Sequence, residues 1–159
     1  MEVYFLRHGI ALDRTEWHQD DRQRPLTEEG IARMTREAKT LNRLGLGLDA
    51  IITSPLTRAR HTAEIVAAEL GLQDKLEEDE RLGLRFALPE LREVLTAHAA
   101  VKAIMLVGHE PSFSDTISRL IGGARLECKK GGLARVDISG SVAPEGILQW
   151  LLPPRVLAP

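Results

Sequence analysis

The sequence predicts a three-layer α/β domain, with helices on both faces of a mostly parallel sheet that has an antiparallel edge. Short β-branched and aliphatic runs alternate with longer amphipathic segments four times, as in parallel strands joined by helical crossovers. The last two apolar runs are joined only by a turn rich in Gly, Ser and Pro, which predicts an antiparallel hairpin. All 159 residues are expected to form one domain.

Each predicted strand is a short apolar run that ends at a loop signal. The first gives way to Arg7-His8-Gly9, and the clearest stops at Gly108-His109. Near-continuous apolar runs of this kind are typical of strands buried on both faces. The expected strands are residues 3–6, 49–53, 103–107, 133–138 and 147–152, with a further short strand in the charged segment 73–85.

Helices are predicted between these strands by helical spacing of apolar residues and by the residues at their ends. Thr27 is a good N-cap for a helix that Gly45 stops, and Thr57 is expected to cap a helix that Gly71 closes. The expected helices are residues 28–44, 58–70 and 88–100, and one from Pro111 to Gly122, with regular structure stopping at Pro153-Pro154.

Composition narrows the class of protein. A net charge of -2 gives no bulk attraction to nucleic acid or to anionic lipid, so any anion site must be a local cluster. The sequence has neither a signal-peptide pattern nor an apolar run near the roughly 20 residues needed to span a bilayer. The single cysteine, Cys128, excludes an intrachain disulfide and fits a reducing compartment. A soluble, cytoplasmic protein without nucleic-acid or membrane partners is expected.

Polar clusters follow the predicted strands at their carboxyl ends, where open α/β sheets form ligand crevices. The clusters are Arg7-His8-Gly9, Ser54-Pro55-Leu56-Thr57-Arg58 and Gly108-His109-Glu110-Pro111. Each cluster taken alone also has a purely structural interpretation, since Ser-Pro commonly opens helices and Arg is usually a solvated surface charge. Together they predict a cleft that gathers Arg7, His8, Arg58 and His109. Guanidiniums bind phosphoryl oxygens bidentately, and an imidazole can attack phosphorus or donate to its oxygens.

The ordered motifs resemble those of the histidine phosphatase superfamily, also called phosphoglycerate mutase-like. They are Phe5-Leu6-Arg7-His8-Gly9, Arg24-Pro25-Leu26-Thr27-x-x-Gly30, Ser54-Pro55-x-x-Arg58-Ala59-x-x-Thr62-Ala63 and Val107-Gly108-His109. The short chain and the Arg-Pro-Leu-Thr segment look most like the SixA-type phosphohistidine phosphatases. The resemblance implies that His8 is the nucleophile and forms a phosphohistidine, that Arg7 and Arg58 bind phosphoryl oxygens, and that His109 donates to one. It also implies that no metal or other cofactor is required.

The resemblance further suggests an acid that protonates the leaving group. Larger relatives carry one on a loop after the third strand, and Glu80 is the candidate at that place. The alternative is that Glu80 belongs to a solvated acidic run, residues 77–80. A phosphohistidine expels imidazole, with a reference pKa of about 6.5, whereas a serine ester expels a far more basic alkoxide. A missing acid would therefore favour phosphoramidate substrates.

Three functions stay open at this point. The leading one is removal of phosphate from phosphohistidine on a protein partner, such as a phosphorelay or phosphocarrier protein, with inorganic phosphate as product. Short connections over the cleft leave no long insertion to build a lid, which favours a protein substrate. The second is a phosphatase of small phosphomonoesters, which a deep cleft and a working Glu80 would favour. The third is a non-catalytic phosphoprotein-binding module, against which the presence together of Arg7, His8, Arg58 and His109 argues.

Overall fold

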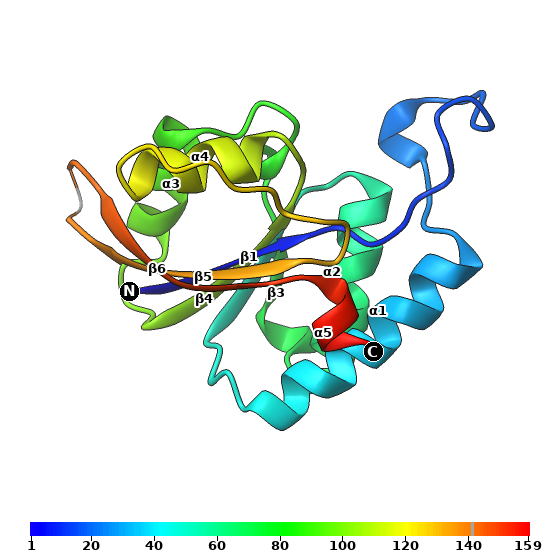
Figure 1. Ribbon diagram of the computed structural model, residues 1–159, viewed down its shortest axis with the longest axis horizontal. Coiled ribbons are helices and arrows are strands. Elements are labelled where there is room, and N and C mark those ends of the chain that lie inside the picture. The colour runs from blue at the N-terminus through cyan, green and yellow to red at the C-terminus, as the bar shows by residue number, and fades with distance from the viewer. Residues whose placement is uncertain (141) are drawn as a thin grey trace.

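The computed structural model describes residues 1–140 and 142–159, and within them a six-stranded sheet forms the middle layer (Figure 1). Its strands are β1 (Glu2–Arg7), β2 (Ala50–Thr53), β3 (Leu76–Glu78), β4 (Ala103–Gly108), β5 (Leu133–Ser139) and β6 (Glu145–Leu152). They lie in the order β3-β2-β4-β1-β5-β6. The strands β3, β2, β4 and β1 are parallel, whereas β5 is antiparallel to β1 and to β6. The predicted mostly parallel sheet with an antiparallel edge is confirmed.

Helices cover both faces of the sheet (Figure 1). One face packs against α1 (Glu28–Leu44), α2 (Thr57–Leu70) and the short α5 (Pro154–Leu157), and the other against α3 (Leu88–Ala97) and α4 (Ser112–Leu120). Short 3-10 turns occur at η1 (Asp21–Gln23), η2 (Gln73–Lys75) and η3 (Glu80–Leu82). Within the described residues, no helix has the length and apolar character that crossing a bilayer would require.

The central strand β1 shows how the sequence divides the core between the two faces. Val3 and Phe5 pack with α3 and α4, whereas Tyr4 and Leu6 pack with α1 and α2. This alternation follows from the two-residue period of a strand. The Phe5 ring meets Phe113 of α4 edge-on, with centroids 5.3 Å apart. Full burial of such a side chain contributes about 1.5–3 kcal/mol, so β1 is firmly held on both sides.

Some helices begin and end where the sequence predicted, and others do not. Thr27 caps α1 by accepting from the backbone N–H of Gly30, and Gly45 ends it in the left-handed conformation, as predicted. Thr57 is not a cap but the first residue of α2; Leu56 is the N-cap, and no side chain among the described residues caps this helix.

Two expectations near the other helix ends were wrong. The third helix ends at Ala97 rather than near residue 100. The next residue, His98, donates from its Nδ1 to the carbonyl of Val94. Pro154 starts the short α5 where a stop was expected. Proline fits a first helical turn, since its fixed φ suits the helix and its missing N–H would be unpaired there.

The chain connections create a crevice between β1 and β4. These strands are parallel neighbours, with Arg7 opposite Gly108 in register. From its carboxyl end β1 leads to α1 on one face, whereas β4 leads to α4 on the other face. In an α/β sheet, a crevice opens where two neighbouring strands lead to helices on opposite faces. The register therefore places His8 and His109, the residues that follow, beside each other at its floor.

Candidate active site

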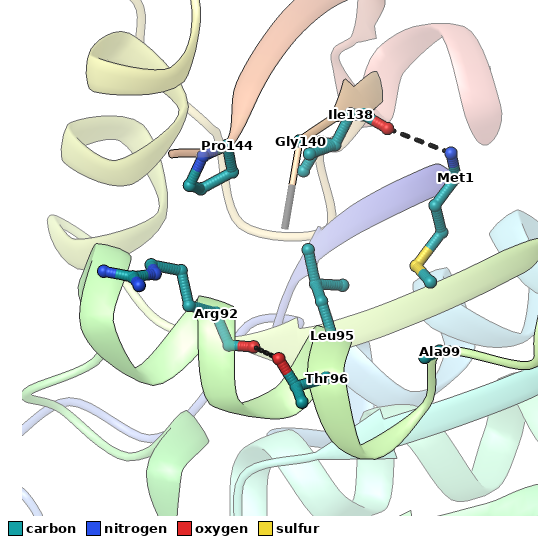
Figure 2. A pocket seen from close by; sticks show the side chains of 8 residues that line it. All are labelled: Met1, Arg92, Leu95, Thr96, Ala99, Ile138, Gly140 and Pro144. Atoms are coloured by element: carbon teal, nitrogen blue, oxygen red, sulfur yellow. Dashed lines mark hydrogen bonds between the residues drawn. The ribbon is translucent and has the colours of Figure 1, made fainter. Parts of the chain in front are cut away.

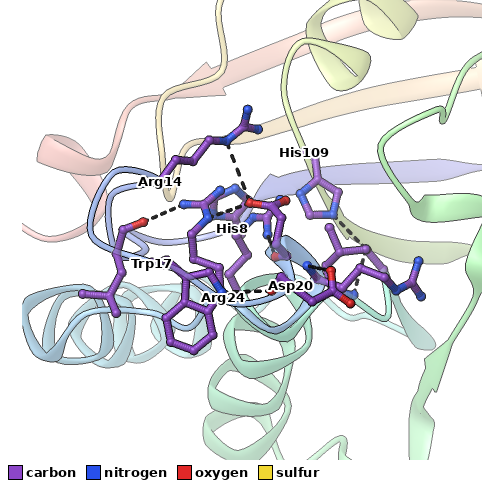
Figure 3. Close-up of polar contacts among 12 residues, drawn as sticks. His8, Arg14, Trp17, Asp20, Arg24 and His109 are labelled. Carbon is purple, nitrogen blue, oxygen red and sulfur yellow. Dashed lines mark hydrogen bonds and ion pairs between the residues drawn. The ribbon is translucent and has the colours of Figure 1, made fainter.

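The structure brings four of the predicted site residues together in one cleft of about 660 Å³. Arg7 and His8 come from the end of β1, Arg58 from the first turn of α2, and His109 from the end of β4. The rings of His8 and His109 have centroids 5.3 Å apart and are tilted by 56° (Figure 3). Two imidazoles and two guanidiniums therefore share one partly enclosed space.

His8 is held as a neutral imidazole with a defined free nitrogen. Its Nδ1 lies 2.7 Å from the carbonyl oxygen of Gly9. A carbonyl only accepts hydrogen bonds, so Nδ1 carries the ring hydrogen and Nε2 carries the lone pair. Burial lowers the pKa of His8 well below its ordinary value, and the charges of Arg58 and Arg7 lower it further. His8 therefore keeps a nucleophilic nitrogen at neutral pH.

Thr62 links the loop of His8 to the turn of Arg58. Its Oγ1 accepts the backbone N–H of Gly9 at 3.0 Å and donates to the carbonyl of Arg58 at 2.8 Å. Both bonds are buried, so the hydroxyl fixes the two backbone segments relative to each other. Sequence reasoning quoted Thr62 within a motif but gave it no role.

His109 contacts a hydroxyl that can set its tautomer. Its Nε2 lies 2.7 Å from Ser54 Oγ. That hydroxyl already accepts the N–H of Leu56 at 3.2 Å, so its own hydrogen is available to be donated to His109 Nε2. Nδ1 then carries the ring hydrogen and acts as a donor. Burial and the charge of Arg58 lower the pKa of His109 to about 3, which keeps the ring neutral.

Arg58 is almost fully buried and is oriented by Asp21 from the segment before α1. Its Nη1 donates to the Asp21 carbonyl at 3.0 Å, and its Nη2 lies 3.3 Å from the Asp21 carboxylate. The same carboxylate accepts from Arg24 Nε at 2.9 Å. Burial opposes ionisation of Asp21, but the hydrogen bond from Arg24 and the charge of Arg58 lower its pKa overall.

Within the described residues, three buried N–H donors of this cleft have no hydrogen-bond partner. They are Arg7 Nε, Arg58 Nε and His109 Nδ1. Arg7 itself is anchored by its Nη1, which donates to the Cys128 carbonyl at 2.9 Å. An unpaired buried donor costs about 1–3 kcal/mol, so such groups in a native protein call for an explanation. Cationic and N–H donors of this kind suit the oxygens of an oxyanion.

The fifth predicted residue, Glu80, is not brought into the cleft. It lies on η3 with its side chain 74% exposed, and its carboxylate pairs with Arg22 at 3.1 Å. The physical reason is the position of the preceding strand, because β3 is an edge strand that β2 and β4 separate from β1. The acidic residues that do line the cleft are Asp13, Glu16 and Glu110. Among them, Glu110 accepts the N–H of Ser114 at 2.9 Å.

Sequence reasoning also missed several residues that shape the cleft. Asp21 lies in an irregular polar segment that carries no periodic signal. Arg24 and Ser54 were within quoted motifs, and that was the available signal, yet neither was given a function. In the part of the chain that the structure describes, no group of three or more His, Cys, Asp or Glu residues is arranged to hold a metal ion.

Known proteins share the sequence pattern and the fold of this chain. Residues 3–83 match the model of the histidine phosphatase superfamily (branch 1), and the chain belongs to this superfamily. An uncharacterized protein of Picosynechococcus sp. is 40% identical over 141 residues, which cover 84% of this chain and 82% of that protein. A 2,3-bisphosphoglycerate-dependent phosphoglycerate mutase of Bradyrhizobium diazoefficiens is 34% identical over 74 residues. That match covers 43% of this chain and only 34% of the mutase.

Solved structures with the same fold cover nearly the whole chain. The protein histidine phosphatase SixA, complexed with tungstate, superposes with a TM-score of 0.87 at 24% identity over 99% of both chains. The alpha-ribazole phosphatase of Shigella flexneri superposes with a TM-score of 0.76 at 19% identity over 97% of both chains. The predicted phosphoglycerate mutase-like fold and its likeness to SixA are confirmed. Membership of the superfamily makes the protein a phosphatase or mutase-type enzyme.

Proposed function

We propose that this protein removes the phosphoryl group from phosphohistidine on another protein, through a phosphohistidine intermediate on His8. The observation that carries the proposal is the set of unpaired buried donors on Arg7, Arg58 and His109 around the neutral ring of His8. These donors fit phosphoryl oxygens, and His8 Nε2 supplies the lone pair. The structural likeness to the protein histidine phosphatase SixA supports the protein substrate.

The proposed reaction has two displacements at phosphorus. In the first, His8 Nε2 forms a bond to phosphorus while the bond from phosphorus to the substrate histidine breaks. His8 keeps its Nδ1 hydrogen on the Gly9 carbonyl, which stabilises the positive charge of the phosphorylated ring. In the second, water attacks phosphorus and the bond to Nε2 breaks with its electron pair returning to the His8 ring; one hydrogen of the water stays on the released phosphate and the other passes to solvent. Arg7, Arg58 and His109 stabilise the oxyanion in both steps.

The leaving group supports a phosphohistidine as the substrate. Imidazole has a reference pKa of about 6.5, so it leaves without a strong acid, whereas an alkoxide does not. The exposed Glu80, paired with Arg22, is placed poorly to supply a proton within the cleft. A substrate that needs little protonation therefore does not depend on Glu80.

The proposal is tested by trapping the intermediate. A protein or peptide carrying labelled phosphohistidine is mixed with the enzyme, and the reaction is quenched in base, where phosphohistidine survives. We expect label on His8 and release of inorganic phosphate, with both lost in His8→Ala. Label on another residue would contradict the role of His8. Faster turnover of small sugar phosphates than of phosphohistidine would contradict the substrate.

A second candidate is a phosphatase of small phosphomonoesters. Two observations favour it: the cleft volume of about 660 Å³ suits a small ligand, and Glu110 lines the cleft beside His109. In this reading Glu110 would protonate the leaving alkoxide. Glu110→Gln should then slow esters with basic leaving groups while sparing p-nitrophenyl phosphate, whose leaving group needs no proton. Equal effects on both esters would remove this candidate.

A further inference from the structure

We infer that a basic shelf beside the cleft docks an acidic surface of the phosphoprotein that this enzyme acts on. The inference rests on the proposed function. The basic shelf is defined by Arg33, Lys129, Lys130 and Arg155, which line a cavity of about 720 Å³ next to Arg7. Sequence reasoning assigned no function to any of these four residues.

The shelf is continuous with the cleft. Arg7, Ile10 and Lys130 line both cavities, so a molecule whose phosphoryl group reaches His8 has the shelf directly beside it. The backbone N–H of Gly131 donates to the carbonyls of Arg7 and His8, each at 3.1 Å. These bonds fix the loop that carries Lys129 and Lys130 against the end of β1.

The cations of the shelf come from separate parts of the fold. Arg33 projects from α1, Lys129 and Lys130 from the loop before β5, and Arg155 from α5. A chain with a net charge of -2 thus gathers positive side chains at one place. Such local gathering attracts and orients a negatively charged partner even when the whole protein is nearly neutral.

Part of this positive charge is not neutralised by the protein itself. Lys129 pairs with Glu127 at 2.7 Å, and Arg33 lies 3.2 Å from the buried carboxylate of Glu37. Lys130 and Arg155 are exposed, and neither forms an ion pair within residues 1–140 and 142–159. These two side chains are therefore available to carboxylates of a partner.

The exposure of the side chains on the shelf favours a protein as its ligand over a second phosphoryl group of a small molecule. The cleft alone has the volume that a small ligand needs. Its donors are buried and fixed, as on Arg58 and His109, whereas Lys130 and Arg155 are exposed ends of long side chains. Exposed, flexible cations are poor parts of a pre-organised phosphate pocket but are typical of the polar rim of a protein interface.

The test compares two synthetic peptides that carry one phosphohistidine each, flanked by Glu in one and by Gln in the other. Binding is measured by fluorescence anisotropy to His8→Ala, which cannot turn the peptides over. We expect the Glu peptide to bind about five- to tenfold more tightly at low salt, since each exposed ion pair is worth about two- to fivefold. The ratio should approach one at about 0.5 M salt.

The shelf variant is K130E/R155E, made in the His8→Ala protein, and it should abolish the preference for the Glu peptide. The matched control is K39E/R92E, which changes net charge equally at exposed residues. Lys39 lies on another part of α1, and Arg92 lies at a separate cavity lined by Met1 and Leu95 (Figure 2). The control should keep the preference. Using ratios of Kd cancels any effect of a variant on phosphoryl binding itself.

The outcomes separate the shelf from the proposed function. Equal affinity for the two peptides, or a preference that survives in K130E/R155E, would overturn the docking role. Tighter binding of pyrophosphate than of phosphate, lost in the same variant, would assign the shelf to a small bisphosphorylated molecule and overturn it too. Failure of the active enzyme to release phosphate from either peptide would overturn the proposed function, while the Kd ratio still decides the shelf.

Discussion

At the scale of single residues, the cleft keeps buried donors unpaired around a histidine that cannot easily be protonated. Arg58 and His109 each present one such donor. We predict that Arg58→Ala and His109→Ala each lower kcat by about 10²–10³, the usual loss for one oxyanion donor. The measurement is phosphate release from a phosphohistidine peptide. Arg60→Ala, two positions from Arg58 and paired with Glu64 on the surface, should keep its rate. A His109 or Arg58 variant with full rate would contradict the assigned role.

We propose that Ser54 acts one step further from the phosphoryl group, through the tautomer of His109. Without its hydroxyl, His109 Nε2 loses its 2.7 Å partner, and either ring nitrogen can carry the hydrogen. We predict that Ser54→Ala lowers kcat by about three- to tenfold, the worth of one hydrogen bond, with a smaller change in KM. Ser54→Thr keeps a hydroxyl and should restore most of the rate. A loss in Ser54→Thr as large as in Ser54→Ala would indicate a packing effect instead.

At the scale of elements, α1 carries a buried carboxylate that faces the loop of the basic shelf. Glu37 is fully buried, and a side chain at Gly131 would meet its carboxylate at 2.7 Å. Burial raises the pKa of Glu37 to about 8, although Arg33 opposes this. The folded protein therefore holds a proton that the unfolded chain releases above about pH 4.5. Stability from this group is complete below that pH and is lost as pH rises toward about 8.

Glu37→Gln removes this dependence, because an amide has no proton to lose. We predict that the variant is about 1–4 kcal/mol more stable than the wild type near pH 8. Near pH 5 the difference should be small. Urea unfolding at both pH values measures this, with Glu64→Gln on the surface of α2 as the control. A stability difference independent of pH would show that Glu37 does not titrate as described.

Close approach between elements also explains why one glycine of the Arg-Pro-Leu-Thr motif belongs there. A Cβ at Gly30 would lie 2.1 Å from the backbone oxygen of Ile10. That oxygen accepts the N–H of Thr27 at 2.9 Å, so the segment after His8 lies directly on the first turn of α1. The segment forms one wall of the cleft, and only glycine permits this contact.

The same scale shows what could be predicted from the sequence. Arg7, His8 and His109 were found because they directly follow buried strands, and the geometry of parallel sheets brings such positions to one edge. Asp21 was not found from the sequence, because its segment has no periodic pattern and its contact with Arg58 depends on tertiary folding. Glu80 was placed by analogy with larger relatives, and here its carboxylate pairs with Arg22 on an exposed 3-10 turn outside the cleft. The α5 helix was missed because proline was treated only as a stop.

At the scale of the whole molecule, the unpaired donors link binding to stability. Each costs the empty fold free energy that a bound oxyanion would return, and the unfolded chain has no such site. We predict that inorganic phosphate or vanadate at about 100-fold over its Kd adds about 2.7 kcal/mol of stability. For a domain of this size that raises Tm by about 5–10 °C. Thermal unfolding measures the shift, with sodium chloride at matched ionic strength as the control. Arg58→Ala should lose most of it, because it removes one of the two guanidiniums proposed to hold the anion. An equal shift from chloride would mean that the anion acts as a salt and that the donors of the cleft do not bind it.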